Sequence, residues 1–312
     1  MLIKETPAQL TDKLWMLGTA AYPLYLFRGA GGGTIFEGGV GSMGPLLLEQ
    51  MEQLEIARDF VKQVVVTHAH PDHVMAVPLF RQVFPGVTVL ASETAAKTLS
   101  AEKAISFFTQ VDEALNNSLA AAGLITDQHR PAPLTEKQIA VDRTVAEGDA
   151  IEVDQGVAFG VLQTPGHSDC SLSFFEPHQR VLLVSDATGY YMPEHDCWWP
   201  NYFGGYEAYM ASMRRLAGLG AEVLCLSHNA AVKGAEAVKD YFDRDVAATE
   251  AYHRRIVDEI KAGKPVRQLA EELGAEVYEK TQLLPLEFFQ KNCGLLVKLS
   301  LRHEGIHAEK KE

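Results

Sequence analysis

The chain has 312 residues, of which 47% are hydrophobic and 22% are charged, the balance of a globular enzyme rather than of a disordered chain. Its formal net charge of −13 argues against a nucleic-acid substrate, because an acidic surface repels a phosphate backbone. The first residues lack a basic segment followed by an apolar one, and no apolar stretch reaches the ~18 residues of a membrane span. We therefore expect no membrane partner. The four cysteines are scattered and form no CxxC pair, so we expect a cytoplasmic protein with reduced thiols.

The first part of the chain is predicted to form short strands joined by glycine-rich turns. Apolar and β-branched runs place strands at 14–17, 22–27 and 34–36. The glycine-rich stretch 29–33 lies between two of these strands, so it indicates a hairpin turn and not a dinucleotide-binding loop. Apolar residues at helical spacing between 46 and 54 then predict a helix.

The next segment combines parallel-sheet and helix signals. The β-branched run 64–66 predicts a buried strand, which ends in the sequence THAHPDH. An apolar stripe predicts a helix over 74–83, which Pro85 and Gly86 terminate. Another strand is predicted at 87–90. This order of strand, loop, helix and strand indicates a layered α/β domain.

Two regions of the chain are predicted to be mainly helical. Residues from about 92 to 138 are rich in Ala, Leu, Glu, Lys and Gln, and we interpret them as a helical insertion. After it, strands are predicted at 150–153, 157–163, 171–175, 181–184 and 223–226, with one helix at 206–219. Strand signals stop after about residue 232, where helices are predicted at 238–260, after Pro265 and at 286–299. We therefore expect one α/β domain over 1–232 and a helical C-terminal cap or extension over 233–312.

The sequence HAHPDH after the predicted strand carries the clearest chemical signal. In an extended segment, residues two apart point the same way, so His68 and His70 can bind one cation together. Pro71 is a good first residue of a helix, and the resulting turn redirects Asp72 and His73 toward a second cation. Three imidazoles and a carboxylate suit zinc, iron or manganese better than magnesium or calcium, which prefer oxygen ligands.

This pattern resembles the HxHxDH motif of the metallo-β-lactamase superfamily, which lies at the end of a strand. Three later segments are similar to further motifs of that family, in the same order. They are TPGHS around His167, VLLVSD ending in Asp186 and LCLSH ending in His228. The resemblance covers about 10–230 and implies an αββα sandwich, here with a helical insertion and a helical C-terminal extension.

The resemblance also implies a ligand set for two divalent metal ions. His68, His70 and His167 would hold the first metal, Asp72, His73 and His228 the second, and Asp186 would bridge them. Zinc is the expected metal, with iron or manganese as alternatives. One position departs from the family pattern, because Glu37 stands where the family often has an aspartate. The support that this position gives to the ligands is therefore an open point.

Such a centre implies hydrolysis. Two cations that share a water lower its pKa toward neutrality, and Asp72 would orient the bridging hydroxide that results. This chemistry serves esters, thioesters, lactones, β-lactams and phosphodiesters, so the site does not name the substrate. The helical additions resemble the caps of glyoxalase II and of the quinolone-response thioesterase, and the long spacing from His73 to His167 resembles the second. We therefore predict hydrolysis of a small-molecule acyl ester or thioester.

An aromatic segment begins at Tyr190, shortly after Asp186, and extends to Tyr206. It predicts a pocket for an apolar acyl group, with Tyr190 near the developing oxyanion. A lactonase is the first alternative, because the superfamily's lactonases are similar in placing a tyrosine soon after the bridging aspartate. His195 lies in the same segment, and its role is left open.

Proteins of other functional classes share this scaffold. A mononuclear-iron persulfide dioxygenase, which would use ligands of the His68 and His70 type, stays open. Diiron flavoproteins of this fold typically have a glutamate at the position of His70, and a degenerate binding protein would not need a complete ligand set. The remaining histidines are interpreted as ordinary surface or core residues: His129, His178, His253, His303 and His307. The amphipathic C-terminal helices also predict a homodimer contact.

Overall fold

The computed structural model describes residues 1–306 and divides the chain into two compact units. The sandwich unit consists of Met1–Gln163, Cys170–Ser185 and Gly220–Val238. The helical unit consists of Thr164–Asp169, Asp186–Leu219 and the segment from Lys239 on. Each unit is thus assembled from segments far apart in the sequence. The division into an α/β domain over 1–232 and a helical C-terminal cap or extension over 233–312 stays a prediction. His307 lies outside the described residues.

The first sheet of the sandwich unit has seven strands in the order β2-β3-β4-β5-β6-β7-β8. Their bounds are β2 Ala8–Gln9, β3 Leu14–Gly18, β4 Pro23–Gly29, β5 Gly32–Phe36, β6 Val61–Val65, β7 Thr88–Ala91 and β8 Arg143–Thr144. β4 and β5 form the predicted antiparallel hairpin, whereas β5, β6 and β7 pair in parallel. Because parallel strands end at the same edge, β6 delivers the HAHPDH sequence to the carboxyl edge of this sheet.

The second sheet of the sandwich unit also has seven strands, in the order β1-β16-β15-β12-β11-β10-β9. Their bounds are β1 Leu2–Ile3, β9 Ala150–Asp154, β10 Val157–Gln163, β11 Leu172–Glu176, β12 Val181–Ser185, β15 Val223–Leu226 and β16 Ala231–Lys233. β12 and β15 pair in parallel, and the other neighbours in the sheet are antiparallel. Ser185, the last residue of β12, and His228, which follows β15, therefore lie at the same edge.

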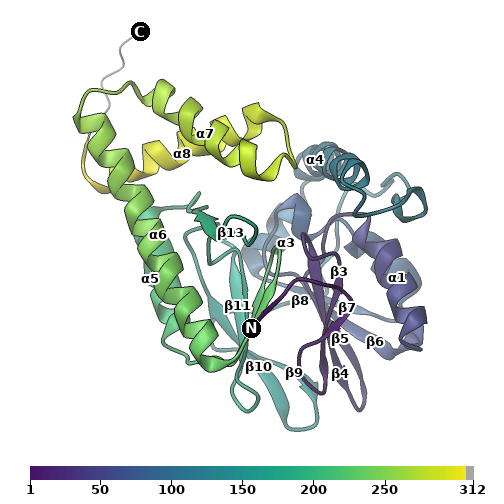
Figure 1. The fold of residues 1–312 in the computed structure, drawn as a ribbon. Helices are drawn as coiled ribbons and strands as arrows, with labels where there is room; N and C mark the ends of the chain where they lie inside the picture. Colours follow the sequence, from purple (N-terminus) through teal and green to yellow (C-terminus); the bar gives the residue numbers. More distant parts are fainter. Residues whose placement is uncertain (307–312) are drawn as a thin grey trace. The chain divides into compact units, whose positions relative to one another are not determined.

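The apolar core of the sandwich unit lies between the two sheets, whose strands are seen in Figure 1. Phe36 of β5 has its ring centroid 4.8 Å from that of Phe159 on β10 and 5.3 Å from that of Phe174 on β11. All three rings are fully buried. Since burial of one such side chain contributes about 1.5–3 kcal/mol, these contacts hold the sheets face to face.

Four α-helices belong to the sandwich unit: α1 Met43–Gln53, α2 Val77–Val83, α3 Glu93–Leu99 and α4 Glu102–Ala121. The last two, with the 3-10 turn η3 Asp127–His129, occupy the segment predicted as a helical insertion. Two side chains of α4 attach it to the loop after β5. Asp112 accepts a hydrogen bond from the Gly41 N–H (2.7 Å), and the Asn116 carbonyl oxygen accepts one from the Ser42 N–H (3.1 Å).

The helical unit contains α5 Tyr206–Ala217, most of α6 Ala235–Lys261, α7 Val266–Thr281 and α8 Leu286–His303. It also contains a hairpin of β13 Tyr190–Met192 and β14 Cys197–Trp199, which the sequence patterns did not predict. α7 and α8 approach closely, since a Cβ at Gly274 would lie 2.6 Å from the Gln290 backbone. None of the described helices combines the length and the apolar character that a bilayer crossing requires.

The turn after β6 differs from the prediction. Pro71–His73 form a single 3-10 turn (η2), and α2 begins only at Val77. The N–H groups of Met75 and Ala76 donate to carbonyl oxygens of the loop after β5, at 2.8 and 3.0 Å, instead of continuing a helix. These tertiary hydrogen bonds delay the start of the α-helix to Val77 and leave the Asp72 and His73 side chains on a tight turn.

Candidate metal centre

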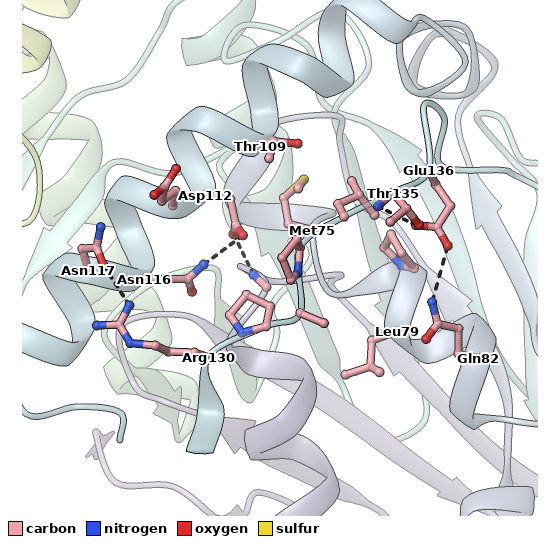
Figure 2. Close-up of a pocket in the computed structure, with 17 residues that line it drawn as sticks. Met75, Leu79, Gln82, Thr109, Asp112, Asn116, Asn117, Arg130, Thr135 and Glu136 are labelled. Carbon is pink, nitrogen blue, oxygen red and sulfur yellow. Dashed lines mark hydrogen bonds between the residues drawn. The ribbon is translucent and has the colours of Figure 1, made fainter. Parts of the chain in front are cut away.

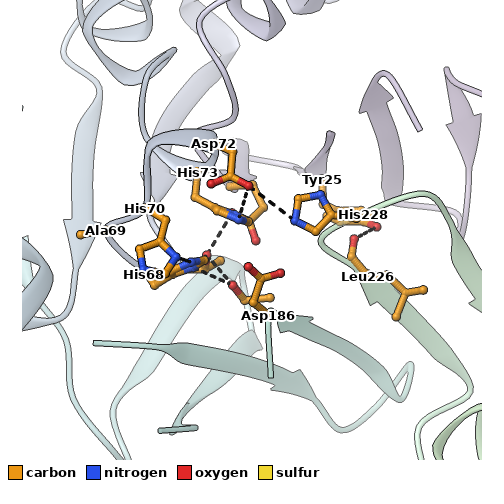
Figure 3. A network of polar contacts seen from close by, with 12 residues as sticks. Tyr25, His68, Ala69, His70, Asp72, His73, Asp186, Leu226 and His228 are labelled. Carbon is orange, nitrogen blue, oxygen red and sulfur yellow. Dashed lines mark hydrogen bonds and ion pairs between the residues drawn. The ribbon is translucent and has the colours of Figure 1, made fainter. Parts of the chain in front are cut away.

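Three potential metal ligands converge in the sandwich unit: Asp72, His73 and His228 (Figure 3). Their ligand atoms lie within 4.8 Å of one another. Asp72 Oδ2 is 3.4 Å from Nε2 of His73 and 3.6 Å from Nε2 of His228. Ligand atoms held at ~2.1 Å from a tetrahedral cation are about 3.4 Å apart, so this spacing fits a single ion.

His73 is positioned by a close approach of two loops. The Gly38 N–H donates to the carbonyl oxygen of His73 at 2.9 Å. A Cβ at residue 38 would lie 2.4 Å from that oxygen, so only glycine allows the contact. The β5 loop thereby holds the backbone of the 3-10 turn that carries two of the three converging ligands.

His228 is oriented by the opposite end of the sequence. Its Nδ1 is 2.9 Å from the carbonyl oxygen of Ala21, and because a carbonyl can only accept, Nδ1 carries the proton. The Tyr22 ring lies edge-on to the imidazole, with centroids 5.3 Å apart. The adjacent Asn229 N–H donates to Ala20, at 2.6 Å. Nε2 of His228 is therefore left with its lone pair directed toward Asp72.

His68 and His70 lie beside this group, with Nε2 of His68 3.0 Å from Nδ1 of His70. The His68 ring is fully buried, and its centroid is 4.1 Å from that of His73. Two imidazole nitrogens that face each other at this distance can share one proton or bind one cation. The second possibility matches the prediction that this pair serves a metal next to the Asp72 group.

A chain of hydrogen bonds connects Nδ1 of His68 with Nδ1 of His73. The Nδ1 of His68 lies 3.1 Å from the Ser185 hydroxyl, which donates to the Thr67 hydroxyl at 2.8 Å. Thr67 in turn donates to Oε2 of Glu37 at 2.9 Å, and Nδ1 of His73 lies 2.8 Å from the same oxygen. Since a carboxylate only accepts hydrogen bonds, Nδ1 of His73 carries a proton. Through Thr67 and Ser185 the same holds for Nδ1 of His68. The lone pair of each ring is then on Nε2, the atom that would bind a metal.

Glu37, which stands where the family often has an aspartate, therefore supports the predicted ligand His73. Its backbone has a φ of 79°, a left-handed conformation that is uncommon for a residue other than glycine. The side chain is almost entirely buried. Sequence spacing could not assign it this role, because the bond to His73 crosses from the end of β5 to the turn after β6.

The helical unit carries the other two predicted ligands, His167 and Asp186. Nε2 of His167 is 3.2 Å from Oδ2 of Asp186, and both side chains are buried. Nδ1 of His167 donates to the carbonyl oxygen of Asn201 at 2.8 Å, which leaves Nε2 as the ligand atom. Gly166 has a φ of 125°, and a Cβ there would lie 2.2 Å from the Tyr209 backbone. The TPGH turn thus requires glycine for its contact with α5.

The chemistry of these groups fits divalent transition metals. Buried imidazoles with one nitrogen held by an oxygen acceptor, together with carboxyl groups, are the usual surroundings of zinc, iron or manganese. The profile of the metallo-β-lactamase superfamily matches residues 22–228, a span that contains every predicted ligand. The chain belongs to the metallo-β-lactamase superfamily.

The chain is also similar to two hydroxyacylglutathione hydrolases. It is 27% identical to a hydroxyacylglutathione hydrolase of Cereibacter sphaeroides over 213 residues. The match covers 68% of this chain and 64% of the relative, so it spans less than two thirds of that enzyme's length. A second hydroxyacylglutathione hydrolase, from another strain of the same organism, has the same identity and coverage.

Solved structures of superfamily members share the fold. A metallo-β-lactamase family protein from Thermus thermophilus has a TM-score of 0.62 and 22% identity, covering 98% of this chain and 93% of that protein. MEM-A1, a subclass B3 metallo-β-lactamase from a soil metagenome library, has a TM-score of 0.56 and 17% identity, covering 78% and 93%. The predicted fold class, an αββα metallo-β-lactamase-like sandwich with helical additions, is confirmed.

A cavity of about 420 Å³ opens between α2, α4 and the proline-rich loop 130–136 (Figure 2). Asp112 and Met75 line it, as do Pro131 and the neighbouring residues of that loop. Burial raises the pKa of the Asp112 carboxyl to about 6, although hydrogen bonds from Gly41 and Asn116 act in the opposite direction. The helical insertion of this superfamily member therefore forms a concave surface with a buried acid in it.

The aromatic segment is largely committed to packing within the helical unit. The Tyr191 hydroxyl donates to Asp196 at 3.0 Å, and its ring packs on Trp198 with centroids 4.7 Å apart. Trp199 packs edge-on against Phe289 of α8, with centroids 5.5 Å apart. These contacts show that several of the rings pack the hairpin against its neighbours in this unit. Tyr190 is half-buried, and its predicted role stays a prediction.

Proposed function

We propose that this member of the metallo-β-lactamase superfamily is a binuclear metal-dependent hydrolase of carboxylic esters or thioesters. In this proposal the metals are held by the seven ligands predicted from the sequence, which are His68, His70, Asp72, His73, His167, Asp186 and His228. Membership of the superfamily supports it, as does the presence of all seven residues in family order within the matched span. Zinc is the metal that we favour, and iron or manganese would suit the same donors.

One observation carries the proposal: the convergence of Asp72, His73 and His228 with their ligand atoms already at the spacing of a coordination sphere. A carboxyl group between two imidazoles could be only a structural ion pair. Here, however, each imidazole has its Nδ1 occupied by a separate oxygen acceptor, which fixes the tautomer that binds metal. A purely structural pair would not need both rings to be set in this way.

The residues of the chain would divide the work of hydrolysis. Bound divalent cations would supply a water acidic enough to attack at neutral pH and would stabilise the developing oxyanion. Asp72, which is partly exposed whereas His73 is buried, would orient this water and accept its proton. Glu37 would keep His73 in the ligating tautomer during the reaction.

The substrate class rests on the hydroxyacylglutathione hydrolases, relatives whose name denotes hydrolysis of an acylated glutathione. An acyl thioester is therefore the first substrate that we propose. The cavity beside α4 is suited to bind an organic group, because it combines apolar surface from Met75 and Pro131 with the buried carboxyl group of Asp112. A lactone is the second candidate, since Tyr190 follows Asp186 closely and could stabilise an oxyanion.

The test combines metal analysis with a substrate panel on the full chain. We expect two equivalents of metal per chain and turnover of acyl thioesters or esters. His228→Ala and His167→Ala should each lower the metal content, whereas His178→Ala, which removes an exposed histidine, should not. Oxidation of a persulfide by protein with a single iron, without ester or thioester hydrolysis, would replace the proposal by the dioxygenase alternative. Binding of metal by neither wild type nor variants would overturn both.

A further inference from the structure

A second group of potential ligands lies in the helical unit, and none of its members belongs to the hydrolytic set. His253 lies on α6, His303 is the last residue of α8, and Glu304 follows it. Their ligand atoms lie within 4.8 Å of one another. Nε2 of His253 is already 3.1 Å from Oε1 of Glu304, although the two residues are 51 positions apart.

The two imidazoles are held in place by one aromatic ring. Tyr206, at the start of α5, stacks on His253 with centroids 3.9 Å apart and an interplanar angle of 14°. The same tyrosine meets His303 edge-on, with centroids 4.9 Å apart. The two histidine rings are 5.4 Å apart at 74° to each other. Three helices therefore contribute to this cluster, and Tyr206 packs against both of its imidazoles.

His253 is the buried member of the cluster, whereas His303 and Glu304 are exposed. His253 is 5% exposed, and its Nδ1 has no hydrogen-bond partner among the described residues. The hydrogen bond that this ring does make is thus directed at the cluster.

We propose that His253, His303 and Glu304 form a second metal site, which binds a divalent cation of the zinc class. Two nitrogens and one carboxylate oxygen form a donor set typical of zinc, with a water in the fourth position. Ligand atoms around such an ion are about 3.4 Å apart, close to the present separation of His253 and Glu304. His303 and Glu304 are exposed at the end of a helix, where small side-chain rotations can close the remaining distance.

The helix end itself favours a cation. The last carbonyl groups of α8 carry a partial negative charge, and His303 and Glu304 lie at its final turn. A metal bound there would link the end of α8 to the C-terminal half of α6. Within this cluster, the two helices are joined by the His253–Glu304 hydrogen bond. The site would therefore act as a structural clamp of the helical unit and would take no part in the hydrolytic reaction.

The experiment counts metal equivalents on the full chain. Chelated wild-type protein and the variants His303→Ala and Glu304→Gln are titrated with zinc in a calorimeter, and bound metal is confirmed by mass spectrometry. His178→Ala is the matched control, because it also removes an exposed histidine but lies outside the cluster. We expect both cluster variants to bind one equivalent fewer than wild type, while the control binds the same number. Thermal unfolding should show a zinc-dependent rise in Tm that is smaller in both variants.

The outcomes separate this site from the hydrolytic one. Glu304→Gln preserves the ring contacts of His253 and His303, so a loss of metal in this variant cannot come from lost packing. Unchanged stoichiometry in both cluster variants would overturn the proposal and leave a hydrogen-bonded pair. An equal loss in His178→Ala would also overturn it, because it would indicate unspecific binding to surface histidines. Hydrolysis should be unaffected in all three variants, whatever becomes of the proposed substrate class.

Discussion

Oε2 of Glu37 lies 2.8 Å from Nδ1 of His73 and also accepts the hydroxyl of Thr67, 2.9 Å away. Through Thr67 and Ser185 the same carboxyl group is connected to His68. One buried acid thus sets the proton positions of two neighbouring predicted ligands. The left-handed backbone conformation of Glu37 costs on the order of 1–3 kcal/mol. The surrounding contacts hold the residue in this conformation.

Glu37→Gln should weaken metal binding without unfolding the chain. The amide oxygen can still accept both hydrogen bonds, but it lacks the charge that makes His73 a stronger ligand. Loss of such outer support typically lowers metal affinity by about 10–100-fold, and we expect an effect in this range. Zinc titration would measure it. Glu52→Gln, at an exposed position of α1, is the control, and equal affinities of the two variants would contradict the role of Glu37.

Asp72→Asn should keep the fold but lose most of the hydrolytic activity. Asparagine has nearly the same shape, yet it cannot accept a proton from the attacking water and binds metal more weakly. Loss of a positioned general base costs about 10²–10⁴-fold in rate. The measurement is kcat/KM on an acyl thioester, with metal content determined on the same sample. A variant that contains both metals and turns over at the wild-type rate would show that Asp72 is not the base.

Gly38→Ala should disturb the turn that carries the predicted ligands Asp72 and His73 through a steric clash alone. The added Cβ would lie 2.4 Å from the carbonyl oxygen of His73, so either the loop after β5 or the 3-10 turn must shift. Overpacking of this kind costs about 1–3 kcal/mol, and displacement of His73 should also lower metal affinity. Chemical denaturation and zinc titration would measure the two effects.

Gly31→Ala is the matched control for this change, because a Cβ at Gly31 meets nothing within 4 Å. It should leave both the free energy of unfolding and the metal affinity close to those of wild type. If Gly38→Ala behaves like Gly31→Ala, the close approach of the two loops is not what positions His73.

Asp112 should make stability depend on pH in an identifiable way. Its folded pKa is raised to about 6, whereas a free aspartate has a pKa of about 3.9. Because the unfolded chain ionises first, the folded state loses stability as pH rises from about 4 to about 6, and the penalty is complete above that. Asp112→Asn removes this penalty. Its free energy of unfolding relative to wild type should therefore rise by on the order of 2 kcal/mol between about pH 4 and about pH 7.

The measurement for Asp112 is urea unfolding of chelated protein at both pH values. Chelation keeps Asp72, whose charge also acts on Asp112, in the same state in wild type and variant. Asp59→Asn, at an exposed position, is the control and should show no comparable change. A constant difference between Asp112→Asn and wild type at both pH values would show that only a hydrogen bond was lost.

Tyr190→Phe and Tyr191→Phe should separate the two adjacent tyrosines. The Tyr191 hydroxyl is used by Asp196, so its removal should leave kcat/KM near the wild-type value. If Tyr190 donates to the oxyanion, its removal should lower kcat/KM by about 10²-fold, as for other oxyanion donors. Kinetics on a fatty-acyl thioester and on a lactone would measure both. Full activity of Tyr190→Phe on both substrates would limit this tyrosine to packing.

The sequence by itself determined the type and order of most elements and the identity of the predicted ligands. The run before His68 and the strand that ends at Ser185 are local apolar patterns, and local patterns reflect backbone preference and burial directly. The motif around His68 is likewise local, since alternation along an extended chain brings two imidazoles together. Family membership, which these motifs implied, was confirmed.

The tertiary structure decided everything that depends on contacts between distant segments. The 3-10 turn replaced the predicted start of a helix at Pro71 because carbonyl groups of another loop accepted the N–H groups that follow it. The acceptor for His228 is Ala21, 207 positions away, and no periodicity points to such a pair. His253 and His303 looked ordinary in the sequence for the same reason. The spacing of residues along a chain predicts contacts only within a few residues. A set of metal ligands, by contrast, depends on how distant segments of the backbone come together in the fold.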